Sequence, residues 1–219
     1  MIRRVVLAAI LAGIAAGLVM SAIQHWRVTP LILAAEAYET AHPHGADEAW
    51  GPADGLERTG YTVLFNLLTG VAFALIAAAA SLITRLPITP RTGSMWGLAG
   101  FATFMLAPSA GLPPELPGMA KGDLASAQGW WWLAVAATAA GIAVLALTRH
   151  LAFKAAAIGV IALPHLIGAP QASGDSAVPA GLANAFAANA IAVSAVFWIV
   201  LGVVLGYLLA RRTDIQEVH

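Results

Sequence analysis

The sequence contains no cysteine and few charged residues. Without cysteine the chain can form no disulfide, thiolate metal site, iron–sulfur cluster or thiol nucleophile. Charged residues make up 10% of the 219 positions, whereas a soluble domain carries about 25%. The 11 basic and 11 acidic residues balance, so there is no basic surplus of the kind that nucleic acid attracts. The composition therefore excludes a nucleic-acid partner and favours a membrane protein.

Two functional features are also missing. No Gly-x-x-x-x-Gly-Lys loop occurs, so the chain cannot hydrolyse ATP by itself. No Asp or Glu falls in the middle of an apolar stretch, so the carboxylate relay of proton-coupled transporters is absent. We predict that the protein is not an enzyme. A membrane-embedded enzyme is the less favoured alternative, because it would need a nucleophile or a closed metal triad.

Most of the chain consists of long apolar stretches, which the polar segments separate. Each approaches or reaches the roughly 18–20 residues that cross about 30 Å of hydrocarbon as a helix. They cover residues 5–22, 61–84, 93–110, 130–148, 151–168 and 185–209. We predict an all-α, polytopic membrane protein with about six transmembrane helices, formed by a single integral membrane domain over residues 1–219. Five spans is the alternative, because the fifth stretch follows the fourth after a very short connection.

The basic residues between these stretches predict the orientation. Eight of them fall on one side of the membrane, namely Arg3, Arg4, Arg85, Arg91, Arg149, Lys154, Arg211 and Arg212. Only Arg27, Arg58 and Lys121 fall on the other side. Cytoplasmic loops carry the excess of Lys and Arg, so we expect both termini in the cytoplasm. Five spans would place Arg211 and Arg212 outside, against this rule.

Small and aromatic residues predict how the helices pack and where the interfaces lie. Glycines four residues apart let helix backbones approach closely in lipid; the pairs are Gly13 and Gly17, Gly93 and Gly97, and Gly202 and Gly206. Tryptophan and tyrosine are typical of the membrane–water interface. We therefore expect Trp26, Tyr61 and the triplet Trp130–Trp131–Trp132 to anchor the outer interface.

Two proline-rich segments interrupt the outer side. Residues 107–118 contain four prolines, which predict a stiff, extended lid. Residues 163–170 contain Pro164 directly before His165. Both segments, together with residues 42–61, resemble the CbtA family of predicted cobalt transporter subunits, and the resemblance covers the whole chain. That family is usually described with five spans, whereas the charges here favour six.

The resemblance implies a component of cobalt uptake in the bacterial inner membrane, linked to cobalamin synthesis. It also implies a small partner subunit, CbtB, with one transmembrane helix and a histidine-rich motif. On this basis no cofactor is bound permanently, and Co²⁺ is the transported ion. A homo-oligomer remains a further arrangement that the sequence leaves open.

The long external segment 24–60 is rich in acids and histidines. Within it His42, His44, Asp47 and Glu48 occupy one turn-rich loop. Imidazole and carboxylate groups suit Co²⁺ and Ni²⁺, so these four side chains either converge on an ion or form an ordinary solvated loop.

A second group of polar residues falls near the outer ends of the apolar stretches. His165 follows Pro164, which deprives a backbone carbonyl one turn earlier of its hydrogen-bond donor. We expect His25, Asn66 and Asn189 at a similar level, where polar side chains usually face a bundle interior or a wet cavity. Alternatively, the asparagines only join helices by hydrogen bonds. Glu115, between prolines, is predicted to gate the path or bind the ion.

These observations predict a membrane permease subunit for uptake of Co²⁺, with Ni²⁺ as the other candidate cargo. The predicted metal ligands are His165, His42, His44, Asp47, Glu48, His25, Glu115, Asn66 and Asn189. A non-transporting scaffold subunit of a transporter is the alternative from another functional class.

Overall fold

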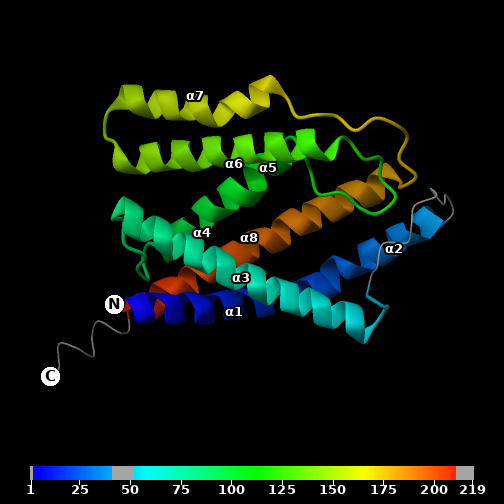
Figure 1. Cartoon of the computed structure of the whole chain (residues 1–219), viewed down its shortest axis with the longest axis horizontal. Coiled ribbons are helices and arrows are strands. Elements are labelled where there is room, and N and C mark those ends of the chain that lie inside the picture. Colours follow the sequence, from blue (N-terminus) through cyan, green and yellow to red (C-terminus); the bar gives the residue numbers. More distant parts are fainter. Residues whose placement is uncertain (1, 41–51, 211–219) are drawn as a thin grey trace. The chain divides into compact units, whose positions relative to one another are not determined.

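The computed structural model describes residues 2–40 and 52–210, and all regular structure in these ranges is helical (Figure 1). The elements are α1 (Ile2–Arg27), α2 (Thr29–Thr40), α3 (Leu56–Thr84), α4 (Gly93–Phe101), the π-helical turn η1 (Ala102–Leu106), α5 (Ala107–Ser109), α6 (Leu124–Leu147), α7 (Leu151–Ile167) and α8 (Ala180–Ala210). The prediction of an all-α protein is confirmed.

All six predicted apolar stretches coincide with helical segments. Four of the helices, α1, α3, α6 and α8, are long and apolar enough to cross a membrane. Helix α7 has 17 residues, and the continuous run from α4 through α5 is similarly short. Such lengths lie at the lower limit for a membrane span. The structure thus fits a membrane protein, while the count of six spans and the side of the termini remain predictions.

The predicted loop 24–60 contains helical structure at both ends. Helix α1 continues to Arg27, and α2 starts directly afterwards with Pro30 in its first turn. Proline is favoured there because the first N–H groups of a helix have no intrahelical acceptor. The N–H groups of Leu31 and Ile32 donate to the carbonyl of Val28 at 3.0 and 3.2 Å. Only Val28 therefore separates α1 from α2.

The chain divides into two compact units, which we describe separately. The first unit comprises Met1–Arg27, Ala46–Gly100 and Ala192–His219, and the second comprises Val28–Gly45 and Phe101–Ile191. The first therefore contains α1, α3, α4 and most of α8. The second contains α2, η1, α5, α6, α7 and the beginning of α8.

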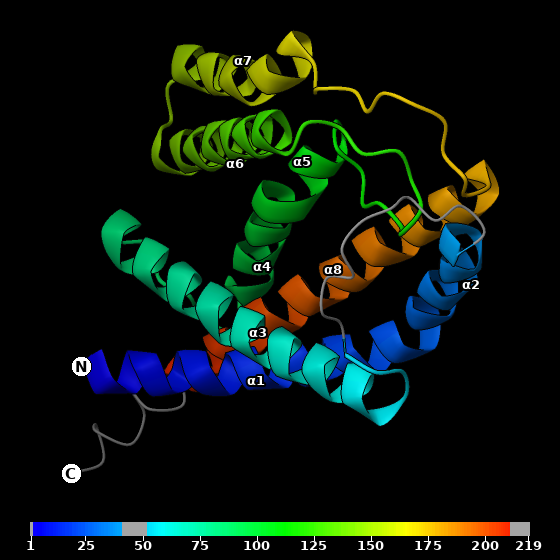
Figure 2. The same ribbon diagram turned by 45° about the vertical axis from the view of Figure 1, so that its right-hand side comes forward.

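In the first unit, glycines bring helix backbones together as predicted. Helices α1 and α3 lie side by side (Figure 2). A Cβ atom added to Gly17 would lie only 2.6 Å from the carbonyl oxygen of Asn66. Likewise, a Cβ atom added to Gly202 of α8 would lie 2.8 Å from the backbone nitrogen of Gly97 of α4. Glycine is required at these points because any side chain would force the helices apart.

In the second unit, α6 and α7 form a close helical hairpin. A Cβ atom added to Gly141 of α6 would lie 3.0 Å from the carbonyl oxygen of Ala157 of α7. Asp123 caps the start of α6, because its carboxylate accepts hydrogen bonds from the backbone N–H and the hydroxyl of Ser126 at 2.9 and 2.6 Å. These bonds lower the pKa of Asp123, so the capping carboxylate is ionised at neutral pH.

The proline-rich segment 107–118 differs from the predicted extended lid. Its beginning is helical, since the N–H groups of Gly111 and Leu112 donate to the carbonyl of Pro108 at 3.1 and 2.9 Å. The preceding π-helical turn explains why a helix tolerates this proline. The N–H of Ala107 donates to the carbonyl of Ala102, five residues earlier, and this wider turn relieves the clash that a proline ring causes in an α-helix.

The later part of the same segment is held by one buried side chain. Leu116 is 2% exposed and lies in an apolar cluster with Ala35 of α2 and Val178 before α8. The N–H of Ala177 also donates to the carbonyl of Gly118 at 3.3 Å. The segment is therefore fixed to its own unit rather than freely extended.

Candidate functional site

The structure distributes the predicted metal ligands over separate parts of the chain. His42, His44, Asp47 and Glu48 lie outside the described residues. His25 and Asn66 belong to the first unit, whereas Glu115, His165 and Asn189 belong to the second. His165 therefore shares its unit with Glu115 and Asn189.

His165 lies in the last turn of α7 and is half-buried. Its imidazole ring packs edge-to-face against Trp130 of α6, with ring centroids 5.7 Å apart and planes at 74°. The preceding residue, Pro164, is fully buried. The indole N–H of Trp130 donates to the carbonyl of Pro164 at 3.1 Å. Together these three residues form what we call the α6–α7 aromatic site.

The backbone at this end of α7 is well satisfied. The carbonyl of Pro164 accepts a second hydrogen bond from the N–H of Gly168 at 3.1 Å. Gly168 has φ = 88°, a conformation that favours glycine at the end of a helix. Proline has no N–H, so the carbonyl that loses its helical donor is that of Val160, one turn earlier. A backbone ligand here would thus come from Val160 rather than from Pro164.

The α6–α7 aromatic site also includes Gly111, two residues after the end of α5. A Cβ atom added to Gly111 would clash with the Trp130 ring, because it would lie only 2.6 Å from the Cζ2 atom. It would also lie 2.9 Å from the Cβ of Ala169. The absence of a side chain at Gly111 therefore makes room for the indole ring. In this way Trp130 touches both the proline-rich segment and the end of α7.

The position of Trp130 corrects one sequence prediction. We expected the whole Trp130–Trp131–Trp132 triplet to anchor the outer interface, but Trp130 is only 6% exposed. It falls on the same helical face as Ala134, Ala137 and Gly141, and this face of α6 is buried. Trp132 is 62% exposed, as an interfacial residue would be. The helical spacing of Trp130 from Ala134 and Gly141 could have indicated a shared buried face. However, small residues occur on every side of α6, so this spacing does not single out one face.

The other two predicted residues of the second unit do not reach His165 through any described contact. Asn189 donates its side-chain N–H to the carbonyl of Ala185 at 2.7 Å, within its own helix. Glu115 is exposed, next to the buried Leu116. Asn189 thus serves α8 locally, while Glu115 keeps its carboxylate at the surface of a fixed segment.

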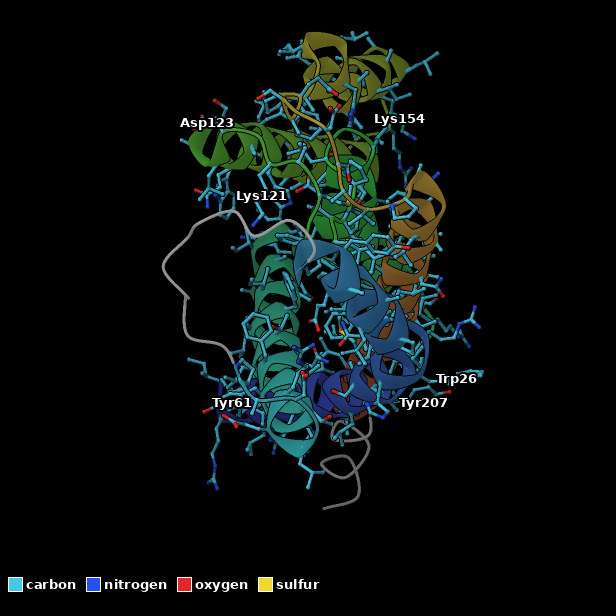
Figure 3. The ribbon with its side chains drawn as sticks, turned by 90° about the vertical axis from the view of Figure 1, so that its right-hand side faces the viewer. Trp26, Tyr61, Lys121, Asp123, Lys154 and Tyr207 are labelled. Atoms are coloured by element: carbon cyan, nitrogen blue, oxygen red, sulfur yellow. The ribbon has the colours of Figure 1, made fainter. Side chains whose placement is uncertain are left out.

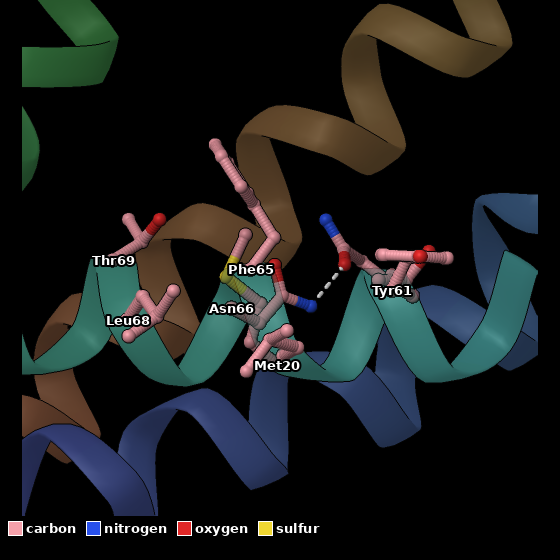
Figure 4. Close-up of a pocket in the computed structure, with 9 residues that line it drawn as sticks. Met20, Tyr61, Phe65, Asn66, Leu68 and Thr69 are labelled. Atoms are coloured by element: carbon pink, nitrogen blue, oxygen red, sulfur yellow. Dashed lines mark hydrogen bonds between the residues drawn. The ribbon is translucent and has the colours of Figure 1, made fainter. Parts of the chain in front are cut away.

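In the first unit, Asn66 joins two helices. It is 5% exposed, and its amide nitrogen donates to Gln24 Oε1 at 2.6 Å (Figure 4). The same nitrogen donates to Ser21 Oγ at 3.1 Å. Ser21 in turn donates to the carbonyl of Gly17 at 2.8 Å. These bonds fit the alternative stated above, in which the asparagine joins helices. Beside them lies a mainly apolar groove of about 540 Å³, lined by Met20, Gln24, Tyr61, Thr62, Leu64, Phe65, Asn66, Leu68 and Thr69.

His25 lies near the exposed end of α1. It is followed by Trp26, which is 74% exposed, and the guanidinium of Arg27 lies 5.5 Å from the centre of the Trp26 ring system. Tyr61 is also exposed, and Figure 3 shows Trp26 and Tyr61 projecting from the first unit. These surroundings are typical of a membrane–water interface.

Within residues 2–40 and 52–210, no three side chains of His, Cys, Asp or Glu gather closely enough to hold a metal ion. An ion bound at His165 would therefore find no complete set of strong ligands in these ranges. Further strong ligands would have to come from residues 42–48 or from another subunit.

Comparisons with known proteins supply the family. No curated protein and no solved structure matches the chain. The family model described as "Probable cobalt transporter subunit (CbtA)" matches residues 2–210, which is nearly the whole sequence. This confirms the resemblance seen in the two proline-rich segments, and with the long apolar helices it shows a transmembrane protein. The chain therefore belongs to the CbtA family of probable cobalt transporter subunits.

Proposed function

We propose that this protein is the permease subunit of a Co²⁺ uptake system, with His165 as the ion-binding side chain inside the apolar helices. The observation that carries the proposal is the half-buried imidazole in the last turn of α7, within a family of cobalt transporter subunits. Ionisable residues within membrane helices are costly and usually functional. Imidazole is a ligand that Co²⁺ binds readily.

The ion path starts, in this proposal, at the outer face. His42, His44, Asp47 and Glu48 gather the cation, and Glu115 binds or gates it near the proline-rich segment. His165 then receives it, while His25, Asn66 and Asn189 support the outer ends of the helices. We further propose six spans with both termini in the cytoplasm of a bacterium, and a link to cobalamin synthesis.

Entry of the ion needs no ATP hydrolysis by this chain. An inside-negative potential of about 100 mV favours a divalent cation by roughly 4.6 kcal/mol, twice the single-charge value. A channel-like route or one assisted by a partner is therefore sufficient. Because His165 has too few companions among the described residues, we propose that a small one-helix, histidine-rich subunit completes the coordination.

The test is uptake of radiolabelled Co²⁺ into cells that lack their own cobalt importers, with the protein alone and with its candidate partner. We expect His165→Ala to reduce uptake at least tenfold, as losses at metal sites commonly do. His150→Ala is the matched control, because His150 is an exposed histidine just before the other end of α7. It should leave uptake unchanged.

The outcomes separate the alternatives. Unchanged uptake in His165→Ala, at equal protein in the membrane, would exclude His165 from the path. No uptake by the wild-type protein in either arrangement would favour the scaffold function. Uptake of radiolabelled Ni²⁺ by the same cells would identify Ni²⁺ as a second cargo.

A further inference from the structure

We propose that Trp130 is a positioning residue that orients His165 for the cation. This inference rests on the proposed function and concerns a tryptophan that the sequence pattern had placed at the membrane interface. Trp130 is buried, and it contacts His165 with its ring and Pro164 with its N–H group.

Trp130 holds the end of α7 from a neighbouring helix. The last four carbonyls of a helix have no intrahelical donors, so the final turn is held only by caps or by other elements. Here the Pro164 carbonyl is held by two donors, the backbone N–H of Gly168 and the indole N–H of Trp130. The bond from Trp130 comes from α6 and therefore fixes the last turn of α7 against its neighbour. His165 lies in that turn, directly after the fixed carbonyl.

Trp130 also contacts the imidazole ring of His165. Its edge-to-face contact with Trp130, at 5.7 Å between ring centres, limits the rotation of the histidine side chain. Histidines that bind metals usually need a second group that holds the ring in one orientation. Among the described residues, His165 belongs to no group of three or more His, Asp or Glu side chains. Trp130 orients the ring by packing instead.

Trp130 also contacts the proline-rich segment 107–118. Gly111 lies against the Trp130 ring, and its missing side chain leaves the room that the ring occupies. Glu115 follows four residues later in the same segment. A shift of the indole would therefore disturb both the end of α7 and the start of the segment that carries Glu115.

The decisive variant is Trp130→Phe, because phenylalanine keeps an aromatic ring but lacks the N–H that donates to Pro164. We would measure equilibrium binding of radiolabelled Co²⁺ to the purified full-length protein, together with its thermal unfolding. We expect the dissociation constant to rise about tenfold, which corresponds to roughly 1.4 kcal/mol. Trp132→Phe is the matched control, since Trp132 is exposed and should leave Co²⁺ affinity unchanged.

The outcomes distinguish this inference from the proposed function. If His165→Ala binds Co²⁺ as the wild type does, the proposed site itself is wrong. If His165→Ala loses binding while a folded Trp130→Phe keeps wild-type affinity, only the positioning inference is overturned.

A second measurement, independent of how Trp130→Phe folds, tests whether the ion binds beside Trp130, as the positioning role requires. Co²⁺ quenches the fluorescence of nearby tryptophans, so its binding at His165 should quench part of the wild-type emission. The same quenching should persist in Trp132→Phe and disappear in His165→Ala. Equal quenching in folded wild type and His165→Ala would contradict a Trp130–His165 ion site.

Discussion

At the scale of single residues, two polar side chains in apolar helices, Asn66 and His165, have different surroundings. Asn66 directs its amide nitrogen to two side chains of α1, so its hydrogen-bonding capacity is used to join helices. The His165 ring packs on Trp130. A polar residue in an apolar helix thus indicates either packing or ligand binding, and its partners decide between them.

The role of Asn66 leads to a prediction about stability. Replacing it in Asn66→Leu removes the donor to Gln24 and Ser21, and leaves those groups without this partner in an apolar environment. We expect a loss on the order of 1 kcal/mol, since hydrogen bonds between membrane helices average about 0.6 kcal/mol each. Thermal unfolding in detergent would measure it.

Asn184→Leu is the control for this substitution. It makes the same chemical change at an exposed position of α8, so the midpoint of unfolding should stay the same. Equal midpoints for Asn66→Leu and the wild type would show that the two hydrogen bonds add nothing to stability.

At the scale of elements, backbone contacts at glycines determine how closely helices approach. Gly17 of α1 lies against the backbone of α3, where an added Cβ atom would come within 2.6 Å of a carbonyl oxygen. Real Cβ atoms do not approach backbone atoms that closely, so the two helices would have to separate. Gly159 of α7 has nothing within 4 Å of such an atom. The two glycines therefore differ in function although both lie inside apolar helices.

The second prediction compares these glycines directly. Gly17→Ala should destabilise the protein by about 1–3 kcal/mol, because it overpacks a tight contact. Gly159→Ala should be neutral or stabilise by up to about 1 kcal/mol, because alanine favours the helix more than glycine does. Thermal unfolding of both variants under the same detergent conditions measures the difference. An unaffected Gly17→Ala would mean that α1 and α3 do not pack through this glycine.

At the scale of the whole molecule, the orientation in the membrane can be tested with single cysteines, because the natural chain has none. Ser173→Cys lies between α7 and α8, on the predicted outer side. Thr148→Cys lies between α6 and α7, and Thr213→Cys lies after α8, both on the predicted cytoplasmic side. We expect a membrane-impermeant maleimide to label only Ser173→Cys in spheroplasts, and all three after permeabilisation. External labelling of Thr213→Cys would favour five spans.

Much of the fold follows from the sequence alone. Long apolar stretches can satisfy their backbone hydrogen bonds in lipid only as helices or closed barrels, and each predicted stretch is indeed helical. The glycine pairs likewise predicted close contacts, such as that of Gly97 with Gly202. The cobalt-transporter family also followed from two proline-rich segments and is confirmed over residues 2–210. Apolar stretches and glycine spacing are local features of the sequence, so neighbouring residues determine them.

Only the tertiary structure decided which face of each helix is buried. Apolar residues occur on every side of α6, so its sequence has no polar stripe that would mark the face turned away from the core. Trp130 and Trp132 therefore look alike in the sequence, yet one lies under Pro164 and His165 and the other is exposed. Helix rotation and pairing arise from contacts between distant segments, and composition alone does not encode them.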